Sequence, residues 1–104
     1  AIIMDPPAFG HGPKDELWKI EEDFLTLMKL CRELLSEKPL FFLISSYAAG
    51  YSSLAFAHNL FPYMEMYGGS IEHGELTIQE SNSEHPACAS RLLPCGIFGR
   101  WNNK

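Results

Sequence analysis

Residues 1–10 have the sequence AIIMDPPAFG, in which an apolar run from Ala1 to Met4 leads directly into Asp5-Pro6-Pro7-Ala8-Phe9-Gly10. The run predicts a fully buried strand. In open α/β sheets, ligands bind outside the carboxyl ends of the strands, so we expect the segment from Asp5 onward to border a ligand site. The two prolines stiffen this segment and have no N–H, which is expected to leave its carbonyls free. A Pro-rich turn without a ligand role is the alternative.

A long helix and a second apolar strand follow. Apolar residues recur at steps of three and four, which predicts an amphipathic helix over about 14–37 whose stripe is widened by Trp18 and Leu25. Pro39 ends this helix, and the apolar run Leu40–Ile44 predicts a strand buried on both faces, as in a parallel sheet. Together with the first strand they form a right-handed βαβ unit. The expected buried positions of the helix are Leu17, Ile20, Phe24, Met28, Cys31, Leu34 and Leu35.

Polar residues, Ser45-Ser46-Tyr47, end the second strand. Because parallel strands end at the same edge of a sheet, we expect these residues beside Asp5, as the polar floor of a pocket. Asp5 would supply a hydrogen-bond acceptor and Phe9 a flat apolar face, while Gly10 would allow close approach of a ligand. A serine cap at the junction between strand and helix is the alternative, and both interpretations can hold.

A second helix is predicted over about 52–66. Ser52 or Ser53 can cap its start, and Pro62 would end or kink it. Gly68 and Gly69 close the segment. The buried side of this helix is expected to consist of Leu54, Phe56, Ala57, Leu60 and Phe61.

The last third of the chain predicts two strands. Alternation over Gly74–Glu80 indicates a half-buried strand, and Ser81–Pro86 reads as a polar loop. Arg91–Trp101 predicts a final strand with an irregularity at Pro94–Gly96, such as a bulge. We expect the two strands to form an antiparallel hairpin at a sheet edge.

Composition limits the function classes. With 104 residues, 46% of them hydrophobic, the chain has room for one small globular domain. No apolar run approaches the ~20 residues that cross a bilayer, so no membrane partner is expected. The net charge of −5 gives no electrostatic reason to bind nucleic acid alone. Three cysteines, without CxxC spacing, favour reduced thiols and a cytoplasmic location.

Other polar side chains indicate packing rather than chemistry. Cys31 is expected to pack on the apolar side of the first helix, and Cys95 within the last strand. His58 is expected to lie at or near the surface. One set of possible metal ligands fits no standard zinc template, so no metal site is expected. This set is His73, Glu84, His85 and Cys88.

Five short motifs are spread along the chain: Asp5-Pro6-Pro7-Ala8-Phe9-Gly10, Glu16-Leu17-Trp18-Lys19, Ser46-Tyr47, Leu93-Pro94-Cys95-Gly96 and Gly99-Arg100-Trp101. With these motifs the chain resembles the second half of a class I S-adenosylmethionine-dependent methyltransferase. It is most similar to the bacterial ribosomal-RNA large-subunit methyltransferases whose fourth motif is Asp-Pro-Pro-x-Phe. The similarity covers essentially the whole chain.

The resemblance implies the fold class α/β, as the carboxyl-terminal half of a Rossmann-like methyltransferase sheet with strands 4, 5, 7 and 6 and two helices. Residues 1–104 would form the carboxyl-terminal part of a single catalytic domain whose cofactor-binding first half is absent. In this family a Gly-rich loop after strand 1 and an acidic residue ending strand 2 hold the cofactor. Gly10-His11-Gly12 follows the wrong strand for that loop. The isolated chain is therefore expected to be inactive.

The resemblance also implies S-adenosylmethionine as cofactor, bound in part by Asp5, and a nucleobase of ribosomal RNA as substrate. The Asp5 carboxylate and the Pro6 carbonyl would accept hydrogen bonds from an amine, and Phe9 would stack on a base taken out of its helix. Related enzymes that methylate cytosine carbon 5 use a cysteine where this chain has Ser45-Ser46-Tyr47, so an exocyclic amine or a ring nitrogen is expected. The remaining substrate-binding residues would be Pro7, Ser46 and Tyr47.

Two other functions compete with methyl transfer. A non-catalytic fragment that serves only as a folding or association unit would expose an apolar sheet edge beside residues 1–4 and self-associate through it. A small RNA-binding module would need a basic groove. With 8 Lys and Arg against 13 Asp and Glu, it is the least favoured of the three.

Overall fold

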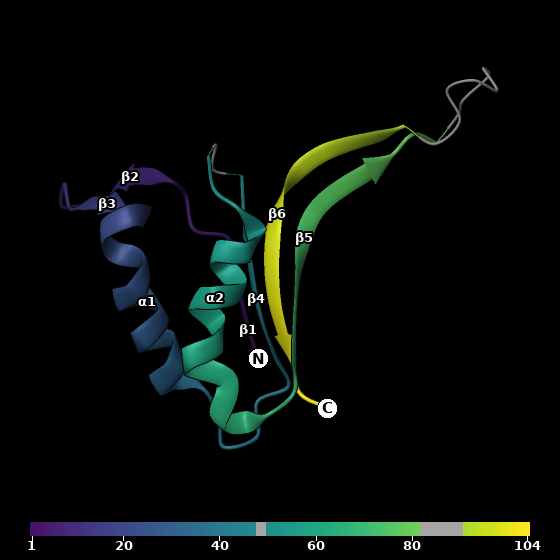
Figure 1. The fold of residues 1–104 in the computed structure, drawn as a ribbon. Helices are drawn as coiled ribbons and strands as arrows, with labels where there is room; N and C mark the ends of the chain where they lie inside the picture. The colour runs from purple at the N-terminus through teal and green to yellow at the C-terminus, as the bar shows by residue number, and fades with distance from the viewer. Residues whose placement is uncertain (48–49, 82–90) are drawn as a thin grey trace.

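The computed structural model describes residues 1–47, 50–81 and 91–104, and within them four strands form one mixed sheet (Figure 1). β1 and β4 are parallel, whereas β6 pairs antiparallel with both β4 and β5. The predicted α/β class, the parallel pair and the antiparallel pair at one edge are therefore confirmed. In spatial order the strands are β1 (Ile2–Met4), β4 (Phe41–Ser46), β6 (Leu92–Asn102) and β5 (Ser70–Gln79).

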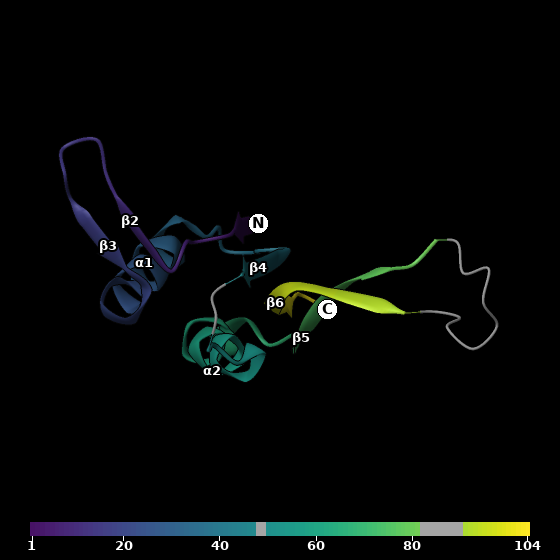
Figure 2. The ribbon, with the colours of Figure 1, turned by 90° about the horizontal axis from the view of Figure 1, so that it is seen from above.

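The helices α1 (Ile20–Leu34) and α2 (Ser53–Met64) pack on the same side of this sheet, as Figure 2 shows from above. The core lies between them and the strands. Its buried side chains are Ile20, Phe24, Met28, Phe42, Ile44, Phe56, Leu60, Met64 and Trp101. In the described part of the chain, neither helix has the length and apolar character needed to cross a membrane.

The first helix begins later than predicted, because a small hairpin replaces its first turns. β2 (Phe9–His11) pairs antiparallel with β3 (Leu17–Lys19), and α1 starts at Ile20. The hairpin turn is closed by a bond of 2.8 Å from the Gly12 N–H to the Glu16 carbonyl, and Asp15 has a φ of +63°. A residue with positive φ cannot continue a right-handed helix. Trp18 therefore belongs to β3 and not to the helix stripe.

The two strands that were predicted from apolar runs, β1 and β4, are less buried than predicted, because the helices cover only one face of the sheet. Ile2 and Met4 pack against the core, whereas Ile3 points to the opposite face and is 68% exposed. Along β4, Phe42, Ile44 and Ser46 are buried, and the residues between them are half-buried. Within the described residues, β1 pairs with β4 alone.

The second helix agrees with the prediction at both ends. The Ser52 hydroxyl caps it by accepting a bond of 3.2 Å from the Leu54 N–H, and Pro62 lies in its last turn. The chain then continues through the 3-10 turn η1 (Glu65–Tyr67) to two glycines with positive φ. Leu54 and Phe61, predicted to be buried, are 45% and 56% exposed, because they flank the side of α2 that packs on the sheet.

The strands β5 and β6 form a long ribbon that continues beyond the end of β4 (Figure 1). Leu76 pairs with Gly96 and Thr77 with Pro94, so Cys95 is the extra residue of a bulge, as predicted for this stretch. β5 is more exposed than predicted. Within the described residues no helix packs on its outer part, and Ile78 is 58% exposed. The predicted loop Ser81–Pro86 lies, beyond Ser81, outside the described residues.

The two described cysteines differ in accessibility. Cys31 is half-buried, and burial raises the pKa of its thiol. Cys95 is exposed, which corrects the prediction that it packs in a strand, because it is the extra residue of the bulge and is opposite no residue of β5. We expect iodoacetamide to modify Cys95 at least about tenfold faster than Cys31 at neutral pH, since the thiolate is the reacting form. Peptide mass spectrometry of timed samples measures both rates, and equal rates in the folded protein would contradict the expectation.

Candidate functional site

The carboxyl ends of β1 and β4 bring two predicted segments together. Met4 is in parallel register with Ile44, so the loop after β1 and the end of β4 lie at the same edge. The Ser46 hydroxyl donates a hydrogen bond of 3.3 Å to the Pro6 carbonyl. The prediction that Ser46 lies beside the Asp5 segment is therefore confirmed. We call residues 5–9 the acidic corner.

Three carbonyls of the acidic corner accept hydrogen bonds, which corrects the prediction that the prolines leave its carbonyls free. Besides the bond to Pro6, the Pro7 carbonyl accepts a bond of 2.7 Å from the Trp18 indole N–H. The Ala8 carbonyl accepts one of 3.0 Å from the backbone N–H of Ile20. The reason is the unpredicted hairpin, which places Trp18 and the start of α1 against the loop.

The predicted site residues divide into exposed and buried groups. Asp5 and Pro7 are exposed, and the rings of Phe9 and Tyr47 are 56% and 82% exposed. Phe9 lies edge-on to the ring of His11, with 5.3 Å between the ring centroids. Pro6 is buried, and Ser46 is only 3% exposed. A carboxylate and an aromatic face are thus available at one sheet edge, and such groups can hold a planar molecule that carries an amine.

Two residues at this edge were missed by the sequence prediction. Gly96, in the bulge of β6, has a φ of +140°, and a Cβ atom there would lie 3.0 Å from the Ser46 carbonyl oxygen. The bulge therefore lies close against the backbone at the end of β4, whose Ser46 bonds to the acidic corner. The second residue is Trp18, which the sequence prediction placed in the helix. The Gly12-Pro13 pair and Asp15 are turn-forming residues, and they are the sequence signal for a hairpin around residues 12–16.

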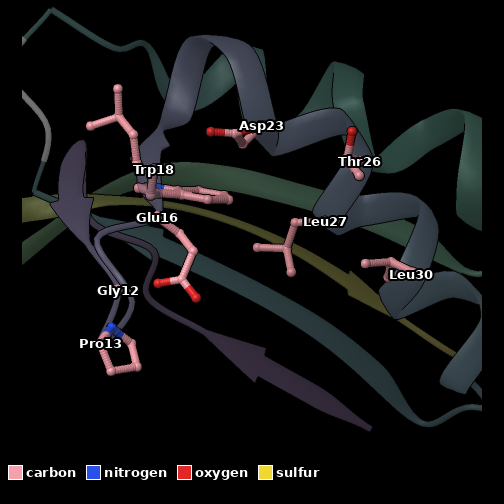
Figure 3. A pocket seen from close by; sticks show the side chains of 9 residues that line it. Gly12, Pro13, Glu16, Trp18, Asp23, Thr26, Leu27 and Leu30 are labelled. Atoms are coloured by element: carbon pink, nitrogen blue, oxygen red, sulfur yellow. The ribbon is translucent and has the colours of Figure 1, made fainter.

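A hollow of about 500 Å³ lies between the hairpin and the outer side of α1 (Figure 3). Figure 3 shows the Trp18 ring and Leu27 bordering the same space, with Glu16 and Pro13 contributed by the hairpin. Asp5 is not among the residues that line this hollow, whereas Trp18 lines it and also bonds to the Pro7 carbonyl of the acidic corner. The lining residues are Gly12, Pro13, Glu16, Leu17, Trp18, Asp23, Thr26, Leu27 and Leu30.

The residues considered as metal ligands are placed only in part. His73 lies on β5, and its Nδ1 is 3.0 Å from the Ser53 hydroxyl. Glu84, His85 and Cys88 lie outside the described residues. Among residues 1–47, 50–81 and 91–104, no three His, Cys, Asp or Glu side chains gather in a way that could hold a metal ion.

Comparison with known proteins relates the whole described fold to one kind of enzyme. No protein-family model matches the chain, and no curated protein gives a significant match. The solved structure of the SAM dependent methyltransferase from Agrobacterium tumefaciens is 30% identical over 99% of this chain, with a TM-score of 0.86. SMU.776, a candidate methyltransferase complexed with SAH, is 24% identical over 96% of this chain and 25% of its own, with a TM-score of 0.49.

The chain spans 33% of the length of the Agrobacterium protein that it matches. The match nevertheless includes almost every residue of this chain, and the mixed sheet with two helices is common to both. Residues 1–104 therefore have the fold of a segment of a SAM-dependent methyltransferase.

Proposed function

We propose that this chain takes part in S-adenosylmethionine-dependent methyl transfer to a nucleobase. One observation carries the proposal: a carboxylate, Asp5, and an aromatic face, Phe9, are exposed at the carboxyl end of β1, in a fold that matches a SAM-dependent methyltransferase over 99% of the chain. This edge is where ligands bind in open α/β sheets.

In this proposal residues 1–104 are the carboxyl-terminal part of a Rossmann-like catalytic domain. The strand order β1-β4-β6-β5 supports it, because the resemblance implies strands 4, 5, 7 and 6 in that spatial order. The match to one third of the Agrobacterium protein also supports it, since that protein has further chain for a cofactor-binding half. The cytoplasm, where thiols stay reduced, is the proposed location.

The chemistry assigned to the acidic corner is the orientation of an amine. The Asp5 carboxylate and the Pro6 carbonyl accept hydrogen bonds from the amine, so that its lone pair points toward the methyl donor. The Pro6 carbonyl has a second lone pair for this purpose, beside the one that Ser46 uses. Phe9 stacks on the base, with Pro7 and Tyr47 completing the surface. Ser46, buried and already bonded, acts on the substrate through Pro6.

The proposed substrate is RNA. More specifically, we propose that the chain belongs among the methyltransferases that act on ribosomal RNA of the large subunit. The residues 45–47 at the end of β4 have no thiol, which favours an exocyclic amine or a ring nitrogen over carbon 5 of cytosine. The net charge of −5 suggests that other parts of a complete enzyme supply the phosphate contacts.

The residues at the corner fit a methyl-donor cofactor in part. The exposed Asp5 carboxylate can accept a hydrogen bond from an amino or hydroxyl group of S-adenosylmethionine. When bound, the cofactor supplies the methyl group. Every other contact proposed here belongs to the substrate side of the corner.

Calorimetry and a transfer assay test the proposal. S-adenosylmethionine is titrated into the protein, in this chain and in any longer polypeptide that contains it. Transfer of a labelled methyl group to ribosomal RNA is then measured. We expect binding and transfer by the form that holds a complete cofactor site. Absence of both in every form would remove the proposed function.

A second function, association through a sheet edge, is favoured by β1. Its outer edge is unpaired in the described part of the chain, and Ile3 on it is 68% exposed. Unpaired edges can accept strands from other molecules, and an inserted lysine opposes such pairing. If the chain associates, we expect Ile3→Lys to lower the association constant at least about tenfold in sedimentation velocity. Leu34→Lys, at an 81% exposed site on α1, should leave it unchanged.

A further inference from the structure

Three consecutive carbonyls hold the acidic corner in place, each bonded to a different element. Ser46 of β4 bonds Pro6, Trp18 of β3 bonds Pro7, and the first residue of α1 bonds Ala8. Pro6 and Pro7 have no N–H, so their carbonyls are the only backbone hydrogen-bonding groups through which this part of the loop can be fixed. The direction in which Asp5 and Phe9 point therefore depends on these bonds.

Trp18 makes the shortest of the three bonds, at 2.7 Å. Its own position is fixed from two sides: its backbone pairs with Gly10 in the hairpin, and its ring borders the hollow beside Leu27 (Figure 3). The Ala8 carbonyl is bonded by the backbone N–H of Ile20, so this bond does not depend on the identity of a side chain. The bond from Ser46 is long, at 3.3 Å. Trp18 is thus the side chain that holds the corner best.

We propose that Trp18 is a positioning residue of the candidate site: it fixes the Pro7 carbonyl and thereby sets the direction of Asp5 and Phe9. Trp18 does not need to touch the substrate for this role. The inference rests on the proposed function for its effect on catalysis. Its structural part, that the indole N–H orders residues 5–9, stands on the geometry alone.

Trp18→Phe tests the inference, because phenylalanine keeps an aromatic ring in the hollow and lacks the N–H. The chain offers a matched control in its other tryptophan. The Trp101 indole N–H also donates a bond of 2.7 Å to a backbone carbonyl, that of Gly68, far from the acidic corner. Trp101→Phe therefore removes a bond of the same length elsewhere in the fold.

In the active form of the enzyme, we expect Trp18→Phe to lower kcat on the order of ten- to a hundredfold, with KM for S-adenosylmethionine changed less than about threefold, because a misdirected acceptor slows the aligned reaction. Trp101→Phe should change kcat less than about twofold, although it removes a partly buried bond. A general loss of folded protein would lower the activity of both variants together, so kcat is calculated per folded enzyme, with the folded fraction measured by circular dichroism. A kcat of Trp18→Phe that is no lower on this basis than that of Trp101→Phe would overturn the inference.

Nuclear magnetic resonance of the 104-residue chain keeps the test independent of activity. In Trp18→Phe the backbone amide signals of Asp5, Ala8 and Phe9 should shift and broaden, while in Trp101→Phe they should stay in place. Unchanged corner signals in Trp18→Phe would overturn the inference even if methyl transfer is found. An inactive wild-type enzyme with shifted corner signals would instead count against the proposed function and leave the ordering role of Trp18 supported.

Discussion

On the proposed function, Asp5→Asn is expected to lower the rate constant of methyl transfer about 10²–10³-fold, the usual cost of removing one preorganised electrostatic partner of a transition state. Asparagine has nearly the same shape, so the loop after β1 should keep its course. The variant loses the negative charge, and its amide presents a donor where the amine of the substrate also presents a donor. The amine would then no longer be held with its lone pair toward the methyl group.

The measurement is kcat at saturating S-adenosylmethionine and RNA, in the form of the enzyme that shows transfer. Asp15→Asn is the matched control, because Asp15 is a carboxylate 93% exposed in the hairpin turn, and its positive φ suits asparagine. This control should keep kcat within about twofold. A wild-type rate in Asp5→Asn would show that the carboxylate has no part in the reaction.

Periodicity along the chain was enough to predict the elements that build the core. The apolar residues Phe24 and Met28 recur at helical spacing and are buried, and the uninterrupted run before Ser45 forms most of the inner strand β4. The bulge in β6 was predicted because proline and glycine interrupt an otherwise regular strand. These signals are local, and each acts through the backbone of a few neighbouring residues.

The hairpin and the burial of single faces could not be predicted in the same way. Leu17 and Trp18 continue the spacing of the helix, so the pattern alone extends the helix over them. In the structure they lie in a strand, because the chain turns at Asp15 and the Trp18 indole bonds to the Pro7 carbonyl. The exposure of Ile3 depends on which elements cover each face of the sheet. The sequence shows where apolar residues lie along a strand, but the topology determines whether another element covers them.

Phe42→Ala is expected to lower the free energy of unfolding by about 3–5 kcal/mol, the usual effect of removing a large side chain from a packed core. Phe42 is fully buried in the inner strand β4, with Ile2 on one side and Trp101 on the other in cross-strand register. A cavity at this position weakens both pairings at once. For a chain of 104 residues such a loss is a large part of the total stability.

Phe61→Ala provides the comparison, because Phe61 is 56% exposed on α2 and its truncation should cost about 1 kcal/mol or less. Urea unfolding followed by circular dichroism gives both values, and similar midpoints for the two variants would contradict the packing described for β4.

The substitution at Phe42 also bears on the acidic corner. Asp5 directly follows β1, which is held in the sheet by β4 alone within the described residues. If Phe42→Ala loosens that pairing, the corner should lose order before the helices do, and hydrogen exchange at Ile3 and Met4 should rise ahead of exchange in α2.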